Sequence, residues 1–296
     1  MNAINVKPNK VYKILITGAC GFIGRSFIEN LENSPHLIYA LDLQSCLFFK
    51  NAVKTFYSLD LARPFQLDET FDFVFHLGGY NVTHVGSQDN ALYTKVNVQG
   101  TKHLLQSAKI KNFIFLSTTK VYKPDGNIDE QSTVEPKNGY EQSKWEAEQI
   151  CAQYFQGGNL TILRSVNIIG PGQMNKAIVP IFFDKALTGK LLNIFVPRDT
   201  RLQFVSVTDV IDLFHLIIAR GGLHGTFNVA FDECICIDEL AKKIIELCHS
   251  QSQIHCMNDD RTNVSQVSAL KIQQAIGWKP TSSIEETLKE CYEFYK

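Results

Sequence analysis

The residues best suited to acid–base chemistry are Tyr140 and Lys144, which lie four positions apart. They fall in GYEQSKWEAEQICAQYF, residues 139–155, which follows Pro136 and is predicted to be a helix with both side chains on one face. A tyrosine has a pKa of about 10, so it acts as a base near neutral pH only if a nearby positive charge stabilises its phenolate. We expect the Lys144 ammonium to supply that charge.

The setting of this pair is more informative than its spacing, because Tyr292 and Lys296 repeat the spacing with no strand-end hydroxyl before them. Upstream of Tyr140, the segment FLSTTKVY, residues 115–122, places hydroxyl groups at the end of an apolar run. Thr118 is expected to donate a hydrogen bond to a substrate oxygen there. The alternative for Thr118 is a strand-end threonine that bonds only within its own turn.

Five short apolar runs, separated by helix-length segments, must position these residues. The runs are VYKILIT (11–17), HLIYALD (36–42), FDFVFHL (71–77), NFIFLST (112–118) and LTILRSV (160–166). They are apolar on both alternating faces, which is typical of parallel strands covered by helices on two sides. The chain is therefore predicted to be an α/β protein with a doubly wound parallel sheet.

Two domains are expected from the change of rhythm along the chain. Residues 1–167 form the sheet domain, and QFVSVTDV (203–210), within a stretch of about 203–230, returns to it. A smaller substrate-binding region comprises about 168–202 and 231–296 and is expected at the carboxyl edge of the sheet, where ligands bind in such folds.

Three glycines in TGACGFIG follow the first strand candidate and precede an amphipathic pattern. Gly18 is suited to the tight turn, Gly21 lets the backbone approach a pyrophosphate, and Gly24 lets helix and strand pack closely. The helix N-terminus then offers free N–H groups to the phosphates. This context favours a dinucleotide site in a Rossmann-type sheet over ordinary turn glycines.

The second strand candidate ends in Asp42, whose carboxylate can accept hydrogen bonds from the adenosine ribose and would repel a 2′-phosphate. Neither Leu43 nor Gln44 is cationic, so the sequence favours NAD over NADP, although the nearby Arg25 keeps NADP as the alternative. Asp60 and Leu61 are expected near the adenine; the alternative for Asp60 is an ordinary loop aspartate.

Composition excludes several other classes of function. The 296 residues carry a net charge of −1, with no basic patch for nucleic acid or an anionic membrane surface. The start, MNAINVKPNK, lacks the apolar stretch of a signal peptide, and no run is long enough to cross a bilayer, so a cytoplasmic location is expected. The eight cysteines lack metal-site spacing, Cys234 and Cys236 included, so we expect no metal site and buried reduced thiols.

Nearly the whole chain resembles the extended short-chain dehydrogenase/reductases of the nucleotide-sugar epimerase/dehydratase group. Besides TGACGFIG and YEQSK, the motifs that carry the resemblance are HLGGYN (76–81), NVQGT (97–101), LRSVNIIGPG (163–172), QFVSVTDV and AIGWKPTSSIEETL (275–288). The resemblance selects Thr118, four residues before Tyr122 of the VY pair, as the catalytic hydroxyl. It makes Tyr140 the acid/base and Lys144 the residue that also holds the nicotinamide ribose.

The resemblance also implies the remaining contacts. The cofactor would lie against Gly18, Cys20, Gly21, Phe22, Ile23, Gly24, Asp42, Asp60, Leu61, Leu77, Gly78, Gly79, Asn97, Tyr140 and Lys144. The substrate would meet Tyr80, Thr118, Asn167, Arg201 and Arg261. Arg201 is displaced by one position from the family's usual arginine. For Arg261, the alternative is a solvated side chain with no contact to the substrate. His76 and His84 fit better as structural or loop residues than as acid/base groups.

The reaction implied is epimerisation. Tyr140, whose phenolate would be stabilised by Lys144 and by the oxidised nicotinamide, takes a proton from a sugar hydroxyl. NAD⁺ takes the hydride, and the keto sugar turns and is reduced on its other face, so that the cofactor is regenerated. Dehydratases of the family usually carry Asp-Glu after the catalytic threonine, where this chain has Thr119 and Lys120. The alternatives are an NAD(P)H-dependent reductase of a nucleotide-linked keto sugar or another small carbonyl and, as a minor one, a catalytically silent dinucleotide-binding sensor. The resemblance also implies a homodimer, formed through the helices that carry NVQGT and YEQSK.

Overall fold

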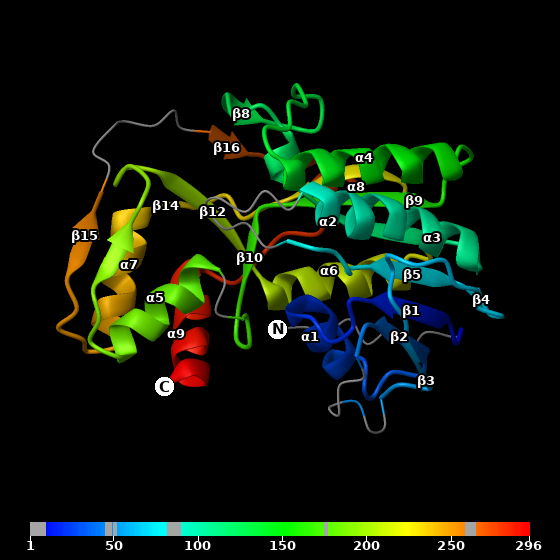
Figure 1. The fold of residues 1–296 in the computed structure, drawn as a ribbon, viewed down its shortest axis with the longest axis horizontal. Helices are drawn as coiled ribbons and strands as arrows, with labels where there is room; N and C mark the ends of the chain where they lie inside the picture. The colour runs from blue at the N-terminus through cyan, green and yellow to red at the C-terminus, as the bar shows by residue number, and fades with distance from the viewer. Residues whose placement is uncertain (1–9, 45–48, 50–51, 82–89, 175–176, 258–264) are drawn as a thin grey trace. The chain divides into compact units, whose positions relative to one another are not determined.

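The structure, a computed structural model, describes residues 10–44, 49, 52–81, 90–174, 177–257 and 265–296 (Figure 1). The chain divides into two compact units. The first comprises residues 1–121, 136–164 and 211–227, and the second comprises residues 122–135, 165–210 and 228–296. Each unit is described by itself.

The central element of the first unit is a seven-stranded sheet in the order β13-β9-β7-β5-β1-β2-β3. Neighbours from β7 to β3 pair in parallel, with Thr17 opposite His76 and Leu41. The strands are β1 (Lys13–Thr17), β2 (Leu37–Asp42), β3 (Thr55–Ser58), β5 (Phe73–His76), β7 (Phe113–Thr118), β9 (Leu160–Ser165) and β13 (Gly225–Val229), with the short pair β4 (Thr70–Phe71) and β6 (Lys109–Ile110) beside them. The doubly wound α/β sheet predicted from the sequence is confirmed.

Helices cover both faces of this sheet. On one face, Phe27 of α1 (Phe22–Asn30) and Phe214 of α6 (Val207–Ala219) contact each other and Phe75 of β5, with ring centroids 4.9–5.0 Å apart. On the other, α3 (Gly100–Ser107) and α4 (Gly139–Tyr154) bury Leu104 and Ala147 against Val74. The two-sided burial explains why the strands are apolar on both faces. The helical segments α2 (Asn90–Tyr93), the π-helical η1 (Thr94–Gln99) and the 3₁₀ turn η2 (Thr119–Val121) complete the unit.

The second unit has its own core beneath a three-stranded sheet, β10-β12-β14. Phe183, Phe204 and Leu240 lie in this core, fully or almost fully buried. The elements are β8 (Gly126–Ile128), β10 (Asn167–Ile169), α5 (Ile178–Leu187), β11 (Leu192–Ile194), β12 (Arg201–Ser206), β14 (Cys234–Cys236), α7 (Ile237–Leu247), β15 (Ile254–Cys256), β16 (Ser265–Val267), α8 (Leu270–Ile276) and α9 (Ile284–Tyr295).

One expectation about this part of the chain is corrected. Residues 203–206 do not rejoin the parallel sheet, because they belong to β12, which pairs with β10 and with β14. The segment that joins the edge of the large sheet is β13, next to β9. An apolar run alone does not identify its partner strand, since both sheets offer a buried position to such a run.

The cysteines also differ from expectation. Cys151 and Cys291 are reduced thiols and buried, whereas Cys234, Cys236, Cys248 and Cys256 are reduced thiols that are only partly buried. Cys20 is disulfide-bonded, so the expectation of reduced thiols is wrong for this residue. None of the helices in the described ranges has the length and apolar character that crossing a bilayer requires.

Candidate active site

Thr118 and Tyr140 come together at the carboxyl end of β7. Thr118 is the last residue of this strand and is 7% exposed, and its side chain is hydrogen-bonded to the Tyr140 phenol. The Thr118 oxygen also accepts a hydrogen bond from the Lys120 N–H at 3.2 Å. Because the backbone donor occupies the oxygen as an acceptor, the hydroxyl hydrogen is free to be donated.

The start of α4 fixes the position of Tyr140. The Asn138 side chain caps the helix by accepting a hydrogen bond of 3.0 Å from the Glu141 N–H, and Tyr140 stands in the first turn that this cap stabilises. Gly139 is also required there, because a Cβ would lie 2.0 Å from the Asn90 side-chain oxygen and 3.2 Å from the Tyr93 ring. The sequence correctly predicted the helix and the shared face of Tyr140 and Lys144.

Lys144 is bound to the strand rather than to the tyrosine. Its ammonium donates a hydrogen bond of 2.7 Å to the Leu116 carbonyl and lies 4.1 Å from the centre of the Phe115 ring. The side chain is buried, and burial lowers the pKa of Lys144 to about 8 from its ordinary value of 10.5, against the opposing effect of the Glu148 carboxylate. The lysine is thus held rigidly one turn from Tyr140.

In this structure, Lys144 is not among the groups that act on the pKa of Tyr140. Burial raises the pKa of Tyr140 to about 12, and Tyr93 and Glu141 act in the same direction. The hydrogen bond from Thr118 is the influence that opposes them. The sequence indicates the spacing of Tyr140 and Lys144 but not that the ammonium is turned toward a carbonyl of β7.

The glycine-rich turn between β1 and α1 has the close contacts that its sequence predicts. Gly18 has a φ of +66°, and a Cβ on it would lie 2.6 Å from the backbone of Gly78. A Cβ on Gly24 would lie 2.2 Å from the Gly18 carbonyl oxygen. Gly21 precedes α1 directly, and Phe22 and Ile23 begin the helix. The turn therefore packs against the β5 end with no space for side chains.

This turn and Asp42 form a cradle that fits a dinucleotide. No side chain caps the N-terminus of α1 and its first turn contains no acidic residue, so its N–H groups suit a pyrophosphate. The Asp42 carboxylate, at the end of β2, accepts hydrogen bonds from the N–H of Cys20 at 2.9 Å and of Leu43 at 2.7 Å. Each carboxylate oxygen retains a further acceptor site, which suits the two hydroxyls of an adenosine ribose.

A chain of hydrogen bonds links the glycine-rich turn to η1 through His76. The Gly78 N–H donates to the Thr17 hydroxyl at 3.2 Å, and this hydroxyl lies 2.7 Å from His76 Nδ1. His76 Nε2 lies 2.9 Å from the Thr101 hydroxyl, which donates to the Asn97 carbonyl. The Thr101 oxygen must then accept, which assigns the hydrogen to Nε2. Burial lowers the pKa of His76 to about 3, so it is a neutral structural residue, as expected. His84 lies outside the described residues.

Asn97 ties the loop after β5 to α4. Its side-chain oxygen accepts from the Tyr80 N–H at 2.7 Å, and its amide donates to the Tyr80 carbonyl and to the Ser143 hydroxyl at 3.0 and 2.9 Å. Leu77, Gly78 and Gly79 belong to this loop, and a Cβ on Gly79 would approach the Asn97 side chain to 3.0 Å. These contacts fix the loop backbone beside the glycine-rich turn.

Two further predicted cofactor residues follow β3. Asp60 accepts a hydrogen bond of 2.9 Å from the Ala62 N–H and forms an ion pair with Arg63, so its carboxylate is occupied within its own loop. Leu61 is buried, and its side chain would lie 3.0 Å from a Cβ on Gly78 and on Gly100. Leu61 thus borders Gly78 and Gly100. The contacts of Asp60 are those of an ordinary loop aspartate, which was the alternative to a role near the adenine.

Tyr93 also belongs to the site, although it is not among the residues predicted from the sequence. Its ring is buried and lies 6.0 Å from the Tyr140 ring and 5.3 Å from the Tyr80 ring. The three rings form an aromatic cluster beside the phenol. The one available signal was the position of Tyr93 shortly before NVQGT, which does not by itself predict which helix face meets Tyr140.

The predicted diphosphate ligands lie in the second unit. The Asn167 amide donates to the Gln203 carbonyl at 3.4 Å, which ties β10 to β12, and Arg201 is exposed at the start of β12. Arg261 lies outside the described residues. The structure therefore brings together Thr118, Tyr140 and Lys144 of the first unit, and it places Asn167 and Arg201 in the other one.

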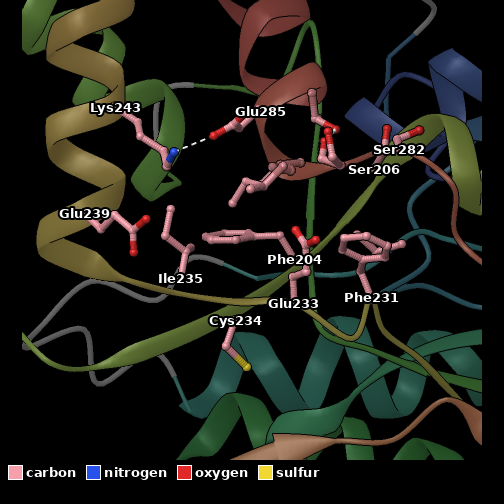
Figure 2. A pocket seen from close by; sticks show the side chains of 15 residues that line it. Phe204, Ser206, Phe231, Glu233, Cys234, Ile235, Glu239, Lys243, Ser282 and Glu285 are labelled. Carbon is pink, nitrogen blue, oxygen red and sulfur yellow. Dashed lines mark hydrogen bonds and ion pairs between the residues drawn. The ribbon is translucent and has the colours of Figure 1, made fainter.

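The second unit also contains a pocket of about 550 Å³, shown in Figure 2. Phe204 and Phe231 line it, and the ion pair of Lys243 with Glu285, 2.6 Å long, crosses one side. None of the predicted site residues that the structure describes lines this pocket.

Comparisons with known proteins identify a family and similar folds. The model of the NAD dependent epimerase/dehydratase family matches residues 14–230. The dTDP-D-glucose 4,6-dehydratase of Homo sapiens is 28% identical over 316 residues, which cover 96% of this chain and 90% of that protein. The dTDP-D-glucose 4,6-dehydratase of Dictyostelium discoideum is 28% identical over 272 residues, 80% of this chain but only 62% of that protein.

Among solved structures, the UDP-glucuronic acid 4-epimerase of Bacillus cereus, in complex with UDP-glucuronic acid and NAD, superposes with a TM-score of 0.83. It is 22% identical, and the match covers 96% of this chain and 98% of that one. At this identity the likeness establishes the fold.

Proposed function

This chain belongs to the NAD-dependent epimerase/dehydratase family, and on that premise we propose that it is an NAD-dependent nucleotide-sugar epimerase, of the 4-epimerase type. The observation that carries the proposal is the hydrogen bond between Thr118 and Tyr140 at the carboxyl end of β7, in the sheet that also carries the glycine-rich turn. Ligands bind at this edge in doubly wound sheets.

The side chains of the chain handle the proton and the orientation of the sugar. Thr118 donates its hydrogen bond to the sugar oxygen, and Tyr140 takes the proton of that hydroxyl and later returns it. Since burial raises the pKa of Tyr140 to about 12, the phenol needs a positive charge close to it before it acts as a base near neutral pH. NAD, when bound, supplies the two-electron acceptor that converts a sugar alcohol to a ketone and back.

The residues proposed to hold NAD are those of the cradle. The N–H groups of the glycine-rich turn and of the start of α1 would bind the pyrophosphate, and Asp42 would bind the adenosine ribose. Lys144 is proposed for the nicotinamide ribose. Asn167 and Arg201 of the second unit are proposed to meet the diphosphate of the sugar nucleotide, for which a planar guanidinium is well suited.

A dehydratase is the alternative that the dTDP-glucose dehydratases among the relatives raise. Elimination of water needs an additional acid/base group at the sugar. Where dehydratases of the family usually carry Asp-Glu, this chain has Thr119 and the exposed Lys120, in the turn η2. Neither side chain is a carboxylic acid, so the site favours interconversion of two sugars over loss of water.

The test is to denature the purified protein, identify any released dinucleotide by mass, and incubate native protein with UDP- and dTDP-hexoses without added cofactor. We expect NAD to be released and an isomer of unchanged mass to form. A requirement for added NADPH would identify the reductase instead, and a product lighter by one water would identify the dehydratase. If nucleotide sugars of both bases are unchanged under all conditions, the proposal is wrong.

A further inference from the structure

Three successive turns of α4 bind consecutive residues at the end of β7. Tyr140 is hydrogen-bonded to Thr118, and Lys144 donates to the Leu116 carbonyl at 2.7 Å. One turn further, Glu148 accepts a hydrogen bond of 2.5 Å from the Ser117 hydroxyl. Residues at i, i+4 and i+8 of a helix lie on one face, so Glu148 continues the stripe that holds the proposed catalytic pair.

Glu148 is a fully enclosed carboxylate with three donor atoms around it. Its side chain is 1% exposed and that of Arg164 is 6% exposed. Arg164 Nε lies 3.1 and 3.2 Å from the two carboxylate oxygens, and Arg164 Nη2 lies 2.6 Å from one of them. The guanidinium also lies 5.4 Å from the Trp145 ring. Removal of one partner of such a buried pair would leave an uncompensated charge on the other.

The charged and titratable groups around Lys144 are few, and the Arg164 cation of β9 is paired with one of them, Glu148. On α4 itself, Glu148 and the Cys151 thiol both favour its protonated form. From β5, His76 is neutral, and the positive charge of Lys144 contributes to the lowering of its pKa. From β7, residues 115–118 are Phe, Leu, Ser and Thr, none of which is charged. Glu148 is therefore the one carboxylate among the groups that act on this ammonium in the described part of the chain.

We propose that Glu148 is a positioning residue that acts through Lys144: its carboxylate, oriented by Arg164 and Ser117, keeps the buried lysine in the ammonium form that the reaction needs. The role rests on the proposed function in so far as Lys144 serves catalysis. A carboxylate one helical turn away compensates for the burial that favours the neutral amine. The ammonium then remains available, at neutral pH, to the ligand and to the phenol.

The test measures the titration of Lys144 directly, by NMR of the full chain with ¹³C- and ¹⁵N-labelled lysine side chains. The Lys144 signal is identified by its loss in Lys144→Met. In Glu148→Gln, the midpoint of the Lys144 titration is expected to fall by about one pH unit or more, because an opposite charge nearby is removed. Glu148→Asp retains the charge and is expected to titrate close to the wild type. Glu146→Gln, the same change two residues along α4 and on another face, is the matched control.

A second variant separates the carboxylate from the unpaired arginine that Glu148→Gln leaves behind. Glu148→Gln/Arg164→Gln removes both charges and also protects against a failure of the single variant to fold. The lowered midpoint is expected to persist in the double variant. If it returns to the wild-type value, or if Glu148→Gln never changes it, the role of Glu148 is structural and the proposal is overturned. The NMR titration needs no turnover, so it decides this proposal even if every nucleotide sugar proves inert.

Discussion

The Lys144 ammonium donates its hydrogen bond to the Leu116 carbonyl, two residues before the threonine that binds the Tyr140 phenol. Lysine and tyrosine are thus fixed to neighbouring residues of one strand end and are not bonded to each other. Their separation by one helical turn leaves the phenol beside Thr118 and places the cation where it acts on bound ligands. The pH dependence of the reaction rate should therefore reflect the protonation of Lys144.

We expect kcat/KM for the sugar nucleotide to fall as pH rises above about 8. Burial disfavours the charged form of Lys144 and lowers its pKa to about 8, so the ammonium is lost as pH rises through that value. The measurement is the pH profile of initial rates under subsaturating substrate. A profile that stays level up to the ordinary lysine pKa of 10.5 would contradict this assignment.

Replacing the proposed acid/base should remove turnover and leave folding intact. Tyr140→Phe removes only the phenolic oxygen, and the loss of a general acid/base typically costs about 10²- to 10⁴-fold in kcat. Tyr292→Phe is the matched control, because Tyr292 and Lys296 repeat the same spacing at the end of α9. We expect the control to keep wild-type activity. Equal kcat values for Tyr140→Phe and the wild type would remove Tyr140 from the mechanism.

The close packing of the glycine-rich turn gives a prediction on stability and cofactor retention. In Gly24→Ala the added Cβ would lie 2.2 Å from the Gly18 carbonyl oxygen, which is backbone and cannot move aside cheaply. Overpacking of this kind costs about 1–3 kcal/mol, so the free energy of unfolding should fall by this amount and the protein should retain less dinucleotide. Urea denaturation and mass analysis of the released dinucleotide measure the two effects.

The control for this change is Gly157→Ala, whose Cβ would meet nothing within 4 Å. It should leave both the unfolding free energy and the retained dinucleotide as in the wild type. If Gly24→Ala behaves in the same way, the turn is not packed as described.

The sequence was sufficient for the parallel sheet and for the shared face of Tyr140 and Lys144, because both depend on local periodicity. It was insufficient for β12, since an apolar strand fits either sheet, and for Tyr93, whose contact with Tyr140 depends on how two distant helices pack. The direction of the Lys144 ammonium could not be predicted either, because its acceptor is a main-chain carbonyl, which every type of residue carries.

The lowered pKa of His76 leads to a prediction of how the free energy of unfolding depends on pH. Its pKa is lowered from 6.5 to about 3 in the folded state, so below pH 6.5 the unfolded chain binds a proton that the folded chain excludes. Between about pH 7.5 and 5.5 this group should lower the free energy of unfolding by about 1.4 kcal/mol. His76→Gln removes the titration, so its loss of stability over this interval should be smaller by that amount. If the wild type and His76→Gln lose the same free energy of unfolding over this interval, His76 is already protonated in the folded state.

In the proposed reaction, one protein molecule oxidises and reduces the same sugar carbon with a cofactor that it retains. The most direct measurement uses UDP- and dTDP-hexoses that carry deuterium at carbon 4, incubated with the purified protein and no added dinucleotide. We expect a 4-epimer of unchanged mass that still carries the deuterium at carbon 4. Loss of the deuterium to solvent, or a product that forms only in proportion to added NAD(P)H, would contradict it.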